Sequence, residues 1–217
     1  MIERKLQKAF DPEKISKPNK QMADLALFSF IKVISKINKY THILEYRNDK
    51  ELQRRMPGYK VKMGFGLHQG WAIEGAIGSF FKIDASYLSP NVNMASRLEA
   101  ATKQYGVPLL VSGSLYDIFT PEIQNLCREI DCVTVKGSKQ PMRLFTVDLD
   151  FDNLEEQDDK FSNLPIKEKK KEREIEKKAL RSKLDKGRFT TWDMYQRDRD
   201  FQELRANFDK HLHKKFQ

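Results

Sequence analysis

KVKMGFGLHQGWAIEGAIGSFFKIDASYLSPNVNMASRLE, residues 60–99, is the stretch of sequence that decides the fold. Its first part alternates apolar and polar residues among several glycines, which is the period of a half-buried strand. Its last part places Val92, Ala95 and Leu98 at helical spacing, and Ser89 or Asn91 is a candidate N-cap for that helix. The stretch therefore predicts a strand, a turn, a second strand and then a helix.

The predicted helix presents two polar side chains on one face. Asn93 and Arg97 are four residues apart, so they lie on the same side of the helix. Pro90 stands in the first turn, where its missing amide costs nothing. From their chemistry alone, two interpretations stay open: a helix cap with a surface ion pair, or two contacts to a ligand.

The motifs GFGLHQGWAIEGAIG and VNMASRLE resemble the catalytic domains of class III adenylate and guanylate cyclases. The resemblance continues through YGVPLLVSGSLYDIF and the hairpin VTVKGSKQPMRLFTVDL, so it covers about residues 20–150. It implies an α+β fold, a partial ferredoxin-like cyclase fold in which helices cover one face of an antiparallel-rich sheet. We therefore expect an incomplete cyclase-homology domain over residues 21–150, and activity remains a separate question because a fold can outlive its chemistry.

The resemblance also assigns roles to individual residues. Asn93 matches the asparagine that positions the ribose, and Arg97 matches the arginine that stabilises the transferring phosphate. Ser86 stands at the base-selecting position, where a hydroxyl can bond to either purine and so does not choose between ATP and GTP. Lys136 matches a lysine-glycine turn, and Lys139 lies one residue beyond the usual phosphate-contacting lysine. These two lysines are nucleotide contacts or exposed turn residues.

Catalysis in this family requires two aspartates that hold two divalent cations. The contexts in which they are expected, D-[IV]-x-G-[FY]-[ST] and a Gly-Asp turn, do not occur before Lys60. Asp11 precedes a proline in a polar arm and Asp24 lies on a predicted helix, so both are interpreted as solvated or helix-capping charges. No metal site is predicted, and Mg²⁺ or Mn²⁺ is expected only if a partner supplies the aspartates. The resemblance thus implies that the chain begins after the first β-α-α-β-β portion of the fold.

Charge, cysteine content and the lengths of the apolar runs limit the kinds of protein that this chain can be. The 217 residues carry a net charge of +9, concentrated near the two ends, so nucleic acid, an anionic membrane or an acidic protein surface would each suit as a partner. No nucleic acid is expected because no RNP-like or zinc-finger pattern occurs. Cys127 and Cys132 form no CxxC or zinc spacing. Without a secretory signal or a membrane-length apolar run, a cytoplasmic protein is expected, and a cytoskeletal or ciliary location is a hypothesis.

The flanks of the domain differ from it in composition. We expect a flexible basic arm over residues 1–20, a helix over 22–37, an acidic linker over 151–164 and a charged helical tail over 165–217. The tail ends in a helix from about Thr191 to Phe216. One stripe of that helix is apolar and aromatic: Trp192, Tyr195, Phe201, Leu204, Phe208, Leu212 and Phe216. The stripe either faces a partner or folds back onto the cyclase-like region.

Three functions follow from the resemblance. The first is a cyclase-homology subunit that is inactive alone and has a structural or regulatory role in a larger assembly. The second is half of a composite cyclase, with Asn93 and Arg97 acting beside a partner's aspartates to make cyclic nucleotide and pyrophosphate in intracellular signalling. The third is a piece of a longer active cyclase. The first is favoured because an incomplete sheet exposes an edge and an apolar face. The expected cover is another cyclase-like chain or a cytoskeletal or ciliary assembly.

Overall fold

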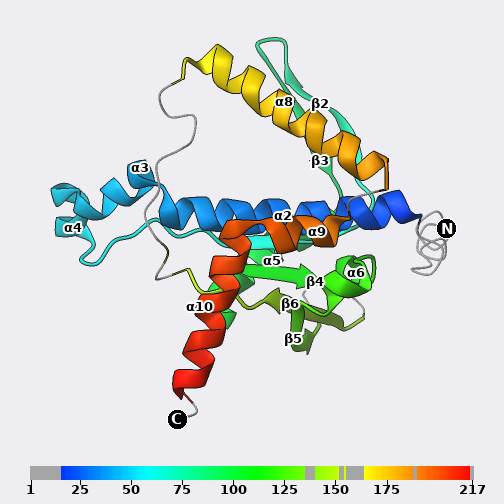
Figure 1. The fold of residues 1–217 in the computed structure, drawn as a ribbon. Helices are drawn as coiled ribbons and strands as arrows, with labels where there is room; N and C mark the ends of the chain where they lie inside the picture. The colour runs from blue at the N-terminus through cyan, green and yellow to red at the C-terminus, as the bar shows by residue number, and fades with distance from the viewer. Residues whose placement is uncertain (1–15, 135–139, 152–153, 155–163, 188–189, 216–217) are drawn as a thin grey trace. The chain divides into compact units, whose positions relative to one another are not determined.

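The computed structural model describes residues 16–134, 140–151, 154, 164–187 and 190–215, except the side chains of residues 207 and 209–215. The chain divides into two compact units. The first contains residues 1–27 and 64–148, and the second contains residues 28–63 and 149–217. Figure 1 shows the elements, which combine helices with sheet and so give the expected α+β class.

A four-stranded sheet organises the first unit, in the order β1-β4-β6-β5. Its strands are β1 (Phe65–Leu67), β4 (Leu109–Ser112), β5 (Cys127–Val133) and β6 (Met142–Val147). β1 runs parallel to β4, while the β4-β6 and β5-β6 pairs are antiparallel. Every residue of β4 is buried, as its continuous apolar run predicts.

Helix α5 (Pro90–Tyr105) packs against β1 and β4. A buried cluster of Leu98, Leu110 and Leu144 joins the helix to the sheet. The approach to β1 is close enough that a Cβ atom on Gly66 would lie 2.4 Å from the backbone oxygen of Ala95. β1 and α5 therefore touch through backbone, which only glycine allows at this position.

A second, separate sheet is the hairpin of β2 (Ile73–Ser79) and β3 (Lys82–Leu88). Its strands are antiparallel, with pairs running from Ile73–Leu88 to Ser79–Lys82. The quoted stretch thus contains three strands where the sequence predicted two. The chain leaves the main sheet after β1 at Gly70, where a Cβ atom would lie 2.2 Å from the side chain of Asn91. The segment between β1 and β2 thus runs close to the start of α5, and the hairpin forms a sheet of its own.

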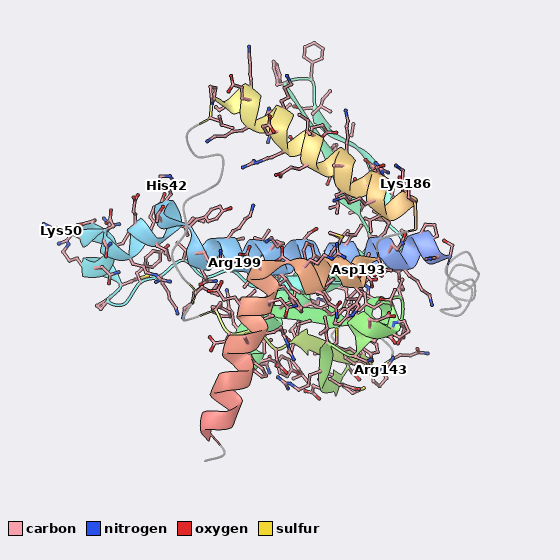
Figure 2. All side chains as sticks on the ribbon, in the orientation of Figure 1. His42, Lys50, Arg143, Lys186, Asp193 and Arg199 are labelled. Atoms are coloured by element: carbon pink, nitrogen blue, oxygen red, sulfur yellow. The ribbon has the colours of Figure 1, made fainter. Side chains whose placement is uncertain are left out.

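Two short helices follow β4, namely α6 (Gly113–Tyr116) and α7 (Pro121–Gln124). The ring of Tyr116 stacks on Phe145 of β6 at 3.8 Å. Arg143, labelled in Figure 2, lies over both rings and pairs with Asp117 at 2.7 Å. These contacts fix α6 against the sheet.

Helix α2 (Lys17–Lys39) begins at Lys17 and not at the expected residue 22. Pro18 lies in its first turn, where the missing amide of a proline is tolerated. Leu27, Ile31 and Ile34 are its buried stripe, whereas the apolar Val33 is 39% exposed. The following elements are α3 (Thr41–Leu44), the 3-10 helix η2 (Glu45–Asn48) and α4 (Lys50–Arg55). Residues 1–15, most of the expected arm, lie outside the described residues.

The tail contains α8 (Ile166–Asp185), α9 (Thr191–Arg197) and α10 (Arg199–Lys215). The prediction of a single last helix is therefore wrong. The break occurs at Asp198, whose carboxylate accepts a hydrogen bond from the amide of Phe201 at 2.9 Å and so starts a new helix. α9 has its own start, a capping box between Thr190 and Asp193, labelled in Figure 2.

The aromatic stripe of the tail folds back onto α2. Tyr195, Phe201 and Leu204 are almost fully buried, and the Tyr195 ring meets Phe28 edge-on at 4.9 Å. Of the two interpretations of the stripe, back-folding is confirmed for these residues. Leu212 and Phe216 lie outside the described side chains.

Ion pairs support the same packing. Lys39, with 4% of its side chain exposed, donates to Glu203 at 2.7 Å and to Asp200 at 3.2 Å. Lys32 donates to Asp198 at 2.9 Å and also to Asp200. Because Lys39 is buried, these pairs are not the weak surface kind, and removing one partner leaves an uncompensated charge.

The network should make stability depend on pH at both extremes. Burial alone would lower the pKa of Lys39, but its hydrogen bonds to Glu203 and Asp200 outweigh burial and raise that pKa above 10.5. Burial alone would raise the pKa of Asp200, but Lys32 and Lys39 hold it below 3.8. The lysine contribution is complete below pH 10.5 and is lost as pH rises further. The Asp200 contribution is complete above pH 3.8 and is lost as pH falls.

Urea unfolding of the wild type and of Lys39→Met across pH would test this dependence. The difference in unfolding free energy between the two proteins should be largest near neutral pH and should shrink in strong acid and in strong base. A difference that stays constant across the whole range would contradict the network.

Candidate functional site

The start of α5 is fixed by its cap. Ser89 is buried, and its hydroxyl accepts hydrogen bonds from the amides of Asn91 at 2.9 Å and Val92 at 3.3 Å. Pro90 follows as the first helical residue. Of the two candidate caps, Ser89 is the one used, and Asn91 is left for another role.

The two residues expected to contact a nucleotide lie together on this helix. Asn93 and Arg97 are both exposed and stand one turn apart on the same face of α5. Ser86 is partly buried in β3, where it pairs with Gly75. Lys136 and Lys139 lie outside the described residues. The structure therefore brings Asn93 and Arg97 into one polar surface, and their role in binding stays a prediction.

Beside the cap lies a hydrogen-bond network that the sequence did not reveal. Asn91 donates through Nδ2 to the carbonyl of Trp71 at 2.8 Å, so its Oδ1 lies 3.2 Å from His68 Nε2 as the acceptor. His68 Nδ1 then accepts from the hydroxyl of Ser112 at 2.9 Å, with Ser114 3.3 Å away. The chain of bonds ties the ends of β1 and β4 to the start of α5 and to the base of the hairpin.

His68 directly follows β1 and has a structural role there. Burial lowers its pKa, and the hydrogen bond to Asn91 opposes that shift only in part. A neutral imidazole satisfies the network, with the tautomer set by the amide of Asn91. Its partners are distant in sequence, so no local motif signalled them.

Within the described ranges, no three His, Cys, Asp or Glu side chains gather as a metal site. In the same ranges, no helix is both long enough and apolar enough to cross a bilayer.

Asp24 corrects one sequence interpretation. It is completely buried, not solvated, and lies well inside α2. Its carboxylate accepts from the amide of Thr120 at 3.1 Å and from the Thr120 hydroxyl at 2.9 Å. It thus holds the start of α7 and not the start of its own helix. Burial and then the charge of Asp24 raise the pKa of the Cys127 thiol to about 12.

Known proteins with similar sequences are adenylate cyclases. An adenylate cyclase of Anabaena cylindrica is 32% identical over 106 residues, which are 48% of this chain and 21% of that protein. The terminal-differentiation specific adenylate cyclase of Dictyostelium discoideum is 30% identical over 88 residues, 40% of this chain and 4% of that protein. The chain therefore corresponds to a small part of each relative.

Among solved structures, an adenylyl cyclase from P. aeruginosa is similar, with a TM-score of 0.42, 22% identity and coverage of 62% of each chain. A family described as the adenylate and guanylate cyclase catalytic domain matches residues 6–148, which contain the four-stranded sheet, the hairpin and α5. This span begins before residue 20, where the resemblance was expected to start. The chain belongs to the adenylate and guanylate cyclase catalytic domain family.

Proposed function

We propose that this chain is one member of a pair of cyclase-type domains, is inactive alone and serves as a structural or regulatory subunit. The observation that carries the proposal is the state of the β2-β3 hairpin. A two-stranded hairpin has marginal stability in water unless something packs on it. Here both of its faces and its tip present apolar side chains to solvent.

The register assigns these side chains to the two faces. Ile73, Ile77 and Leu88 lie on one face, and Ile83 and Tyr87 lie on the other, with each of these side chains at least half exposed. Phe80 and Phe81 form the tip and are 97% and 96% exposed. Large exposed apolar patches mark interaction sites. A second cyclase-type domain, in the simplest case another copy of this chain, would cover both faces.

Sedimentation of the full chain over the micromolar range tests this pairing. The wild type should self-associate, and Ile77→Ser with Ile83→Ser should weaken association by at least tenfold. A matched control is Ile166→Ser with Ile175→Ser, which removes two exposed isoleucines from α8 and should leave association unchanged. A monomeric wild type, or equal loss in both double variants, would contradict pairing through the hairpin. Cyclic nucleotide made by the purified chain alone would contradict inactivity.

A second function, half of a composite cyclase, is favoured by the placement of Asn93 and Arg97. Both side chains are exposed on one face of α5, so they are available to a substrate held partly by a partner's carboxylates. In this function Arg97 would stabilise charge on the transferring phosphate and Asn93 would orient the ribose.

The composite function is tested by mixing this chain with a cyclase-type domain that keeps its aspartates but lacks its own arginine. Cyclic nucleotide should form, and Arg97→Ala should reduce the rate by about 100-fold. Lys103→Ala removes an exposed cation from the same helix and should have little effect. If the mixture forms no cyclic nucleotide, the composite function is contradicted and only the non-catalytic role remains.

A further inference from the structure

The charges of helix α8 are distributed unevenly around its axis. At about 100° per residue, one sector of about 120° contains most of its cations. We call this sector the basic face: Lys167, Lys170, Lys171, Lys177, Lys178 and Arg181. Glu174 and Asp185 fall within the same sector, so its six cations and two acids give it a net charge of +4. The other acids, Glu168, Glu172 and Glu176, recur every four residues and form a row on another side. A run that reads as mixed charge in the sequence is therefore a cationic ridge in the helix.

The basic face points to solvent. All six of its side chains are exposed, whereas the covered side of α8 is marked by buried Leu184 and partly buried Leu180. The helix of 20 residues is about 30 Å long, so the ridge is straight and extended. Figure 2 shows side chains projecting along the whole of α8.

The composition of the ridge favours a diffuse, planar anion over a specific one. Five of its six cations are lysines, which act as point charges, whereas bidentate recognition of single phosphates favours arginine. α8 has no aromatic side chain on which a base of single-stranded nucleic acid would stack. Ile175 borders the ridge and is 50% exposed, so an apolar side chain lies at its edge.

We propose that the basic face of α8 binds the surface of an anionic lipid bilayer. The contact is peripheral and electrostatic, because α8 is too polar to insert. Each lysine near such a surface strengthens binding by about fivefold, so three lysines together contribute about 100-fold. Because exposed charges are screened, binding should weaken as salt is raised.

The test is sedimentation of the full chain with vesicles of phosphatidylcholine, with and without phosphatidylserine. The wild type should bind only the vesicles that contain phosphatidylserine. Substituting Lys167, Lys171 and Lys178 by Gln should reduce binding by about 100-fold. The matched control replaces Lys169, Lys183 and Lys186 by Gln, which removes the same charge outside the basic face and should keep binding within about fivefold.

Three results would overturn the proposal. One is the absence of binding to phosphatidylserine vesicles at low salt. Another is an equal loss in both triple variants, which would show that net charge and not the basic face is responsible. The last is tighter binding to duplex DNA or RNA than to the vesicles at the same salt. Glutamine is a good helix former, so circular dichroism should show that both variants keep the helix.

Discussion

Gly66→Ala should lower the free energy of unfolding by about 3 kcal/mol, because the added methyl group has no room. Its Cβ atom would lie 2.4 Å from both the Ala95 oxygen and the Glu99 nitrogen, and 2.8 Å from the Leu98 Cβ atom. The first two are backbone atoms of α5, which cannot move aside as a flexible side chain can. β1 and α5 would have to separate, and the contact between helix and sheet would loosen.

Gly75→Ala is the control for this substitution. Gly75 lies in β2, and a Cβ atom there would meet nothing within 4 Å. The free energy of unfolding of this variant, measured with urea, should lie within about 1 kcal/mol of that of the wild type. Equal losses at the two glycines would contradict close packing against α5 as the cause of the loss at Gly66.

Asp24→Ala should lower the free energy of unfolding by about 3 kcal/mol. The substitution leaves a small cavity and removes the acceptor for both the amide and the hydroxyl of Thr120. Those groups would then be left without their acceptor at a site where Asp24 itself is fully buried. Asp84→Ala is the comparison, since Asp84 is exposed and its pair with Lys82 is a surface ion pair worth less than about 1 kcal/mol.

A double-mutant cycle isolates the Asp24 contact from other effects of the substitution. Thr120→Ala removes the hydroxyl, and the combination with Asp24→Ala should be less harmful than the sum of the single losses by about 1 kcal/mol. Chemical unfolding of all four proteins measures the difference. Additive losses would mean that Asp24 stabilises the fold without Thr120.

Parts of the fold that depend on local sequence were predictable. The buried strand β4 follows from a continuous apolar run, and the shared face of Asn93 and Arg97 follows from a spacing of four. The family resemblance then gave the α+β class. Each of these inferences uses residues that are neighbours in the chain.

Other parts depend on contacts between distant residues. Asp24 and Thr120 are 96 positions apart, so no local pattern marks the aspartate as a buried acceptor. Asn91 reads as a helix cap in the sequence, but its side chain is used by His68 and Trp71, and Ser89 supplies the cap. The break at Asp198 was missed because the apolar spacing continues across it. Tertiary contacts and capping outweighed the local pattern at each position.

Packing of the tail onto α2 has a practical consequence for anyone who expresses this protein. A fragment that ends at residue 148, where the family match ends, would keep Phe28 and Lys39 but lose Tyr195, Glu203 and Asp200. On α2, the ring of Phe28 would lose its aromatic contact with Tyr195, and the ammonium group of Lys39 would lose its two carboxylate partners. Such a fragment should precipitate or misfold at concentrations where the full chain remains in solution, so cloning boundaries should extend at least through Leu204.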